Sequence, residues 1–146
     1  REILYQEHDL DMKWSRYLPE SIWLLAAFVE THDTNILDDI ARKVIDKDIC
    51  YACCIGTFGA KLHDLIDENI VLREGGIEKL HLPKHLVMTT WHEDITEGLW
   101  FAAFAAFHET APIPKIFCLD IGMNSYKDKI IELIDKFNKG FMPDYE

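Results

Sequence analysis

The chain has 146 residues, a length that fits one domain and buries enough surface to fold without a disulfide or a metal. Hydrophobic residues make up 49% and charged residues 28%, an ordinary globular balance that argues against extended disorder. The formal net charge is −11, from 26 acidic and 15 basic residues without a basic patch, so we expect neither nucleic acid nor a membrane as a partner.

Four apolar runs alternate with four helical patterns along the chain. Residues 21–29 form a continuous apolar stretch, typical of a strand covered on both faces. Asp33 and its neighbours then supply capping chemistry for an amphipathic helix that runs to Lys47. The second strand covers residues 49–55, and Gly56 turns the chain into the second helix.

The second half of the chain repeats this alternation. Residues 86–91 form the third apolar run, and Asp94 and Glu97 have capping-box spacing at the start of a helix over residues 95–108. Residues 115–119 form the fourth strand, and a last helical pattern follows it. The opening segment has no clear pattern.

Alternation of strands and helices predicts an α/β fold, a small Rossmann-like three-layer domain with helices on both faces of a mostly parallel four-stranded sheet. With the strands numbered along the chain, we expect the order 2-1-3-4. We expect a single domain over residues 1–146, with an N-terminal extension at 1–20, a core at 21–140 and a tail at 141–146.

Polar side chains follow the strands at the sheet edge where ligands bind in such folds. If the first and third strands are neighbours, their ends bring together the candidate catalytic residues Glu30, His32, Asp33, His92 and Glu93. Imidazoles and carboxylates hold divalent metals or share protons, so His32, His92 and Glu93 are the candidate metal ligands. The alternative is that Asp33 and Asp94 cap helices while the others are solvated loop residues.

Four further side chains are candidate binding residues: Thr57, Trp91, Phe101 and Asp120. Residues 56–59 lie where a phosphate loop would lie, but they match neither nucleotide-binding glycine motif. A tight turn with Thr57 as a helix cap is the preferred interpretation, and we expect no cofactor.

Phe101 lies on the side of its helix opposite the small residues that suit packing on the sheet. We expect it to be covered either by the N-terminal segment, with Trp14, Tyr17 and Leu18, or by a second copy of the chain. The sequence therefore leaves a monomer and a homodimer open.

Nothing in the sequence indicates export or membrane insertion. The charged N-terminus does not resemble a signal peptide, and the longest apolar run, residues 99–107, is far shorter than the about 20 residues of a membrane span. The four cysteines lie in strand-like runs, including the Cys50-x-x-Cys53 pair, which is placed for core packing rather than redox chemistry. We therefore expect reduced thiols and a cytoplasmic location.

Two segments together resemble a group of small, uncharacterised bacterial α/β domains of unknown function. The first is residues 50–56 with His63 and Asp64, and the second is residues 88–94 leading into residues 97–102. The resemblance covers residues 24–107. It implies a bacterial, intracellular single domain and carries no activity.

Small size, an acidic surface and the lack of a recognised catalytic motif favour a non-catalytic interaction or regulatory module. One form of such a module is an immunity-type protein, which neutralises a basic protein partner. The alternative is a small metal-assisted hydrolase that uses the histidines and carboxylates at the strand ends. Fold alone supports neither function.

Overall fold

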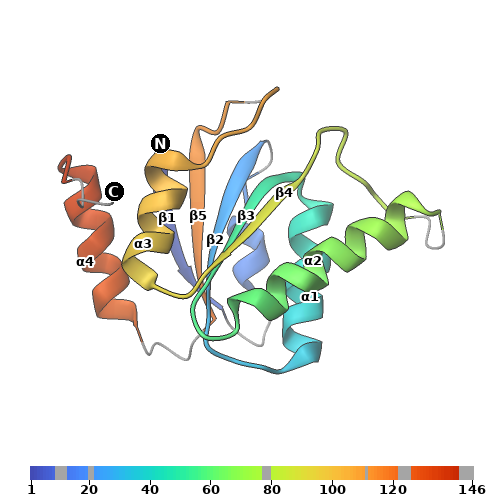
Figure 1. The fold of residues 1–146 in the computed structure, drawn as a ribbon, viewed down its shortest axis with the longest axis horizontal. Coiled ribbons are helices and arrows are strands. Elements are labelled where there is room, and N and C mark those ends of the chain that lie inside the picture. The colour runs from blue at the N-terminus through green and yellow to red at the C-terminus, as the bar shows by residue number, and fades with distance from the viewer. Residues whose placement is uncertain (9–12, 20–21, 77–79, 111, 122–125, 142–146) are drawn as a thin grey trace.

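The computed structural model describes residues 1–8, 13–19, 22–76, 80–110, 112–121 and 126–141. Within these ranges, a parallel sheet of five strands lies between two layers of helices (Figure 1). The strands are β1 (Glu2–Glu7), β2 (Trp23–Val29), β3 (Ile49–Ile55), β4 (Met88–His92) and β5 (Lys115–Ile121). The helices are the 3-10 turn η1 (Lys13–Tyr17), α1 (Thr34–Asp46), α2 (Gly59–Glu74), α3 (Ile95–Trp100), its π-helical continuation η2 (Phe101–Ala105) and α4 (Lys127–Asn138).

The α/β class and the parallel sheet are confirmed, but the predicted strand number and order are wrong. The observed order is β1-β5-β2-β3-β4. Two crossovers, through α1 and α2, carry the chain from β2 to β3 and on to the edge strand β4. The chain then returns through α3 on the opposite face, and β5 pairs with β2. The fifth strand comes from the unassigned opening segment, where Glu2 pairs with Lys115 of β5.

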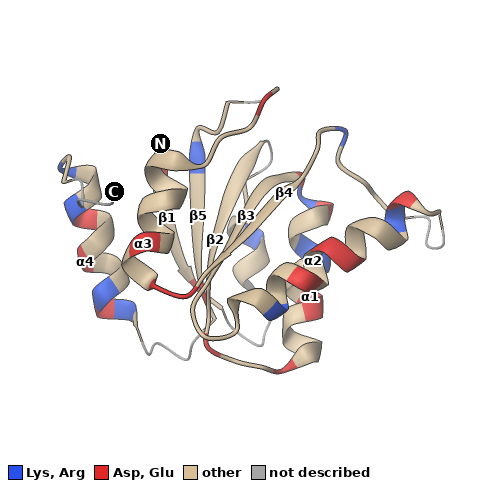
Figure 2. Ribbon diagram, in the orientation of Figure 1, with Lys and Arg blue, Asp and Glu red and all other residues tan. Residues whose placement is uncertain are grey.

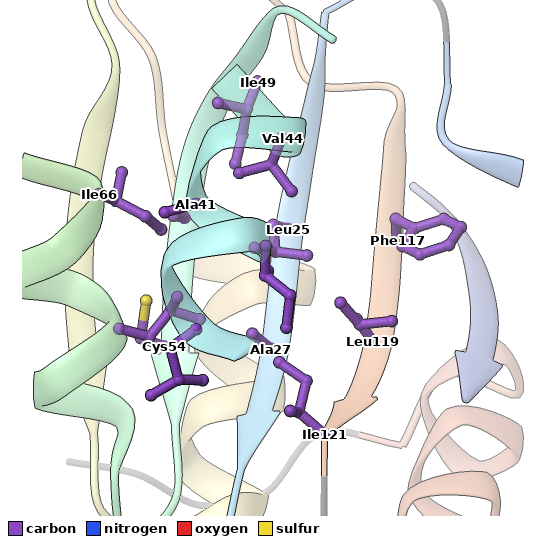
Figure 3. Close-up of a cluster of buried hydrophobic side chains, with 14 of the residues drawn as sticks. Leu25, Ala27, Ala41, Val44, Ile49, Cys54, Ile66, Phe117, Leu119 and Ile121 are labelled. Carbon is purple, nitrogen blue, oxygen red and sulfur yellow. The ribbon is translucent and has the colours of Figure 1, made fainter. Parts of the chain in front are cut away.

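Each face of the sheet carries its own core, because alternate residues of a strand point to opposite faces. Leu25 and Ala27 of β2 face α1 and α2, where they pack with Val44 of α1 (Figure 3). Leu24 and Phe28 face α3 and α4 on the other side. The five consecutive residues Leu24–Phe28 therefore need apolar side chains, which explains the continuous apolar run in the sequence.

One of the two sequence-based alternatives is wrong, because Trp14 and Leu18 do not cover Phe101. Trp14 and Leu18 are buried in the core beneath α1, on the face of the sheet opposite α3. Phe101 instead contacts the rings of Tyr51 and His92, with centroid distances of 6.1 and 4.8 Å. Tyr51 and His92 therefore cover part of Phe101, and the alternative of a second copy of the chain stays a prediction.

The third helix is shorter and less regular than predicted. α3 ends at Trp100, and the π-helical turn η2 brings the chain to Ala106, which is extended with ψ 132°. The guanidinium of Arg1 donates hydrogen bonds to the carbonyl oxygens of Ala102 and Ala106. These contacts satisfy carbonyls that a continuing α-helix would have bonded internally.

No helix in the described part of the chain has the length and apolar character needed to cross a membrane.

Candidate functional site

The carboxyl ends of the strands meet at the lower edge of the sheet in Figure 1. β2 and β5 are neighbours there, and the helices that follow them, α1 and α4, lie on opposite faces. This reversal is the place where ligands bind in open parallel sheets. On the other side of β2, the parallel pairing with β3 places Glu30, after β2, close to Thr57, after β3.

Glu30 occupies the position that an external anion would take at the start of α2. Its Oε1 accepts a hydrogen bond from the Thr57 amide (3.2 Å), and its Oε2 accepts one from the Thr57 hydroxyl (2.6 Å). Gly56 has φ +102°, and a Cβ there would lie 2.6 Å from Glu30 Oε1. The predicted cap at Thr57 is therefore replaced by a carboxylate from a neighbouring strand, which satisfies the positive end of the helix.

The two residues after Thr31 have structural roles. Asp33 caps α1, because its Oδ1 accepts from the amides of Asn35 (3.0 Å) and Ile36 (3.3 Å). The exposed ring of His32 stacks on Phe58 with a centroid distance of 5.4 Å, and its carbonyl accepts a hydrogen bond from Lys61 Nζ. The capping alternative for Asp33 is thus confirmed.

His92 turns away from this cluster, toward α3. Its Nδ1 lies 2.8 Å from Glu97 Oε2 and its Nε2 2.9 Å from Thr90 Oγ1, so both ring nitrogens are engaged. Asp94 Oδ2 accepts from the Glu97 amide (2.7 Å), which confirms one half of the capping box. The other half differs, since the Glu97 carboxylate binds His92.

The five candidate catalytic residues are not assembled into one site. β3 lies between β2 and β4, so His32 and His92 are not at neighbouring strand ends, contrary to the predicted strand order. Glu93 is exposed beyond the end of β4. Across the described residues, no group of three His, Cys, Asp or Glu side chains is placed to hold a metal ion.

Asp120, a candidate binding residue, is buried near the end of β5, with 3% of its surface exposed. The Tyr5 hydroxyl donates to Asp120 Oδ2 (2.8 Å), and burial, reinforced by this carboxylate, raises the pKa of the Tyr5 phenol. An ion pair between Lys127 and Glu7 (2.7 Å) lies beside a cavity of about 270 Å³ that Tyr5 also lines. Sequence reasoning missed Tyr5 because the opening strand was not recognised. The short apolar run Ile3-Leu4-Tyr5, bounded by polar residues, is the signal that could have found it.

A second surface with functional character lies along the edge strand β4 and the segments beside it. Leu86, Trp91 and Phe107 are 68%, 56% and 71% exposed, and Met88 is 39% exposed. Leu86, Met88 and Phe107 line a depression of about 250 Å³. We call these four residues the β4 surface.

Buried His108 holds the two halves of this depression together. Its Nε2 lies 2.6 Å from the carbonyl oxygen of Leu86, and its Nδ1 accepts a hydrogen bond from the Thr110 amide (3.3 Å). Since a carbonyl only accepts, the hydrogen of the neutral ring is on Nε2. The loop that carries Phe107 is thereby tied to the segment that leads into β4.

The cysteines are structural. Cys50, Cys53, Cys54 and Cys118 are buried free thiols in β3 and β5, as predicted. Burial raises the pKa of Cys50 to about 11 and that of Cys53 to about 12, because a thiolate is poorly solvated there. Neither thiol has the reactive character of a redox motif.

The family described as "Domain of unknown function (DUF7684)" matches residues 3–137. The chain belongs to this family. No curated protein and no solved structure matches it. The match confirms the resemblance to an uncharacterised domain, and it covers all of β1 of this DUF7684 domain except Glu2.

Proposed function

We propose that this DUF7684 domain is a non-catalytic protein-interaction module that binds its partner through the β4 surface. One observation carries the proposal. Leu86, Met88 and Phe107 lie together around one depression, and all three side chains are exposed to solvent. Scattered apolar side chains are common on protein surfaces, whereas clustered ones mark interaction sites. Aromatic residues and methionine are also enriched in interface cores.

The engagement of the acid and base candidates supports a binding role over catalysis. Glu30 is bonded to Thr57, Asp33 caps a helix, and His92 is held between Glu97 and Thr90. A general base needs a nitrogen or oxygen that can reach a substrate. These side chains instead stabilise the turns that connect strands to helices.

The charge of the molecule supports a basic partner. The formal net charge is −11, and acidic residues colour much of α2 and the turn between β4 and α3 (Figure 2). Asp64 and Asp67 of α2 lie beside the β4 surface, where Asp67 accepts a hydrogen bond from Thr89 (2.8 Å). Opposite charge speeds the encounter of two proteins and disfavours acidic competitors.

The proposal includes a bacterial, intracellular setting and a regulatory or immunity-type role. The bacterial origin is proposed because the segments around β3 and β4 resemble small uncharacterised bacterial domains. Four buried free thiols support a reducing compartment, since exported domains of this size commonly use cysteines in disulfides.

Selection from a phage-displayed library of random peptides tests the binding role and requires no identified partner. The unmodified domain is the bait, and Leu86→Ser and Phe107→Ser are the test variants. Ile131→Ser is the matched control, because Ile131 is similarly apolar and 43% exposed but belongs to α4, which α3 separates from β4 in Figure 1. All three substitutions are at exposed positions, so each variant should keep the melting temperature.

Selected peptides should be rich in Lys, Arg and apolar residues. They should lose about ten-fold or more in affinity with either test variant, about 1.4 kcal/mol, and bind the control unchanged. Peptides that bind all variants equally, or that show no basic bias, would contradict the proposal.

A further inference from the structure

The outer edge of β4 offers backbone hydrogen-bonding groups to a partner. β4 is the last strand of the sheet, and no strand in the described ranges pairs with its outer edge. The carbonyl of His92 accepts from Gly56 next to β3, so the backbone groups of His92 and Thr90 point inward. Because these directions alternate along a strand, the N–H and C=O groups of Thr89 and Trp91 point outward.

The two sides of this edge differ in chemistry. On the α3 side, Leu86, Met88 and Phe107 form the apolar depression. On the α2 side, the exposed ring of Trp91 packs on His63 with a centroid distance of 5.1 Å.

Two carboxylates accompany that ring on the α2 side. Asp64 Oδ1 lies 3.0 Å from His63 Nδ1, and Asp67 Oδ2 lies 3.5 Å from His63 Nε2. The side chains of Asp64 and Asp67 are 79% and 47% exposed. An aromatic face beside exposed carboxylates suits a Lys or Arg side chain, through ion pairing and cation–π contact.

We propose that an extended segment of a basic partner adds to β4 as a further strand, with apolar and basic residues in alternation. Successive side chains of the added strand point to opposite faces of the sheet. Its apolar residues enter the depression formed by Leu86, Met88 and Phe107, and its Lys or Arg residues meet Trp91 and Asp67. Hydrogen bonds to Thr89 and Trp91 supply the backbone part of the binding. This inference rests on the proposed function and specifies its binding mode.

Charge favours a basic partner over a second copy of the chain. Two β4 strands paired antiparallel about a two-fold axis would place α2 beside its own copy. Asp64, Asp67 and Glu68 of α2 would then approach the same acidic residues of the second copy, and like charges brought together across an interface are destabilising. A segment carrying Lys or Arg has no such repulsion.

Synthetic peptides of alternating valine and lysine test the inference, with alternating valine and glutamate as the charge control. A peptide with the same valines and lysines grouped in two blocks is the pattern control. We expect the alternating valine–lysine peptide to bind about ten-fold or more tightly than either control, by NMR titration of the labelled full chain. Hydrogen exchange at the Thr89 and Trp91 amides should slow about ten-fold on binding, because both become hydrogen-bonded.

Thr89→Pro removes an outward N–H that faces away from β3, and Thr89→Val is its matched control, which keeps the N–H and loses only the contact with Asp67. Binding should fail with the first and persist with the second. Asp67→Lys leaves the sequence of β4 unaltered and should reverse the preference between the lysine and glutamate peptides. This variant tests the inference even if the Thr89→Pro protein does not fold.

The outcomes separate the two proposals. Peptide binding that depends on Leu86 and Phe107 but leaves the Thr89 and Trp91 amides unprotected would overturn strand addition and keep the interaction surface. Equal binding of the lysine and glutamate peptides would overturn the basic partner. No binding at millimolar peptide, or pairing of the domain with itself through β4, would overturn the inference.

Discussion

Replacing Gly59 with alanine would show how closely α2 approaches β3. A Cβ at this position would lie 2.6 Å from the carbonyl oxygen of Cys54 and 2.8 Å from its carbonyl carbon. These are backbone atoms of a central strand paired on both sides, so they cannot rotate away as a side chain would. The start of α2 must therefore move, and the contact between Glu30 and Thr57 with it.

Overpacking of this kind costs typically about 1–3 kcal/mol, while alanine regains at most about 1 kcal/mol of helix propensity. We expect a net loss of about 1–2 kcal/mol in the free energy of unfolding. With a urea dependence of about 2 kcal/mol/M, the unfolding midpoint falls by about 0.5–1 M, measured by circular dichroism.

Gly98→Ala is the matched control for this change. A Cβ at Gly98 would lie 2.7 Å from Cγ1 and 2.9 Å from Cγ2 of buried Ile55, so this change should also lower the stability, but by less, because the atoms that must move belong to a side chain and not to the backbone. A Gly59→Ala protein as stable as the unmodified chain would refute the close approach of α2 to β3.

Three further changes have expected outcomes. Glu30→Ala should lower the free energy of unfolding by about 1 kcal/mol, and sulfate should restore part of that loss more effectively than chloride at equal ionic strength, because an anion replaces the carboxylate at α2. The free energy of unfolding, measured in urea, should hold below about pH 8 and fall as the pH rises from there toward 11–12. The raised pKa values keep Cys50 and Cys53 protonated in the folded chain, whereas the unfolded chain releases those protons near their ordinary pKa of about 8.5. Native thiols should also resist labelling until denaturant is added, and rapid labelling of Cys53 would revive a redox role. Arg73→Ala should lower the free energy of unfolding, measured in urea, by about 3 kcal/mol, because the Arg73 side chain is 1% exposed and bonds both Asp46 and the carbonyl of His81. A loss below about 1 kcal/mol would show that these contacts are replaceable.

Local patterns in the sequence were enough to predict features that depend on residues close together along the chain. The apolar stripe of α1 is buried at Leu37, Ile40 and Val44, and Asp33 caps the helix as expected. Gly140 follows α4 with φ +88°, the conformation that favours glycine after a helix. Such features arise from contacts within a few residues, so periodicity and capping chemistry report them directly.

The expected site depended on which strands are neighbours, and that is a long-range property. The apolar runs of β2, β3 and β5 have similar compositions, so each could occupy any of the central positions of a parallel sheet. Of the four strands that the sequence predicted, only β4 carries a hint of its edge position, in its two threonines. The predicted order made β4 a neighbour of β2, and this error led to the expectation that His92 lies beside His32.

The sequence by itself therefore determined the α/β class, the capped helices and the buried thiols of this DUF7684 domain. The tertiary structure decided the use of its polar side chains. Glu30, after β2, meets Thr57, after the neighbouring strand β3. Leu86 and Phe107 share one depression because His108 ties their loops together. Each of these contacts joins elements separated along the chain, so it follows from the sheet order and crossovers, which local residue patterns do not encode.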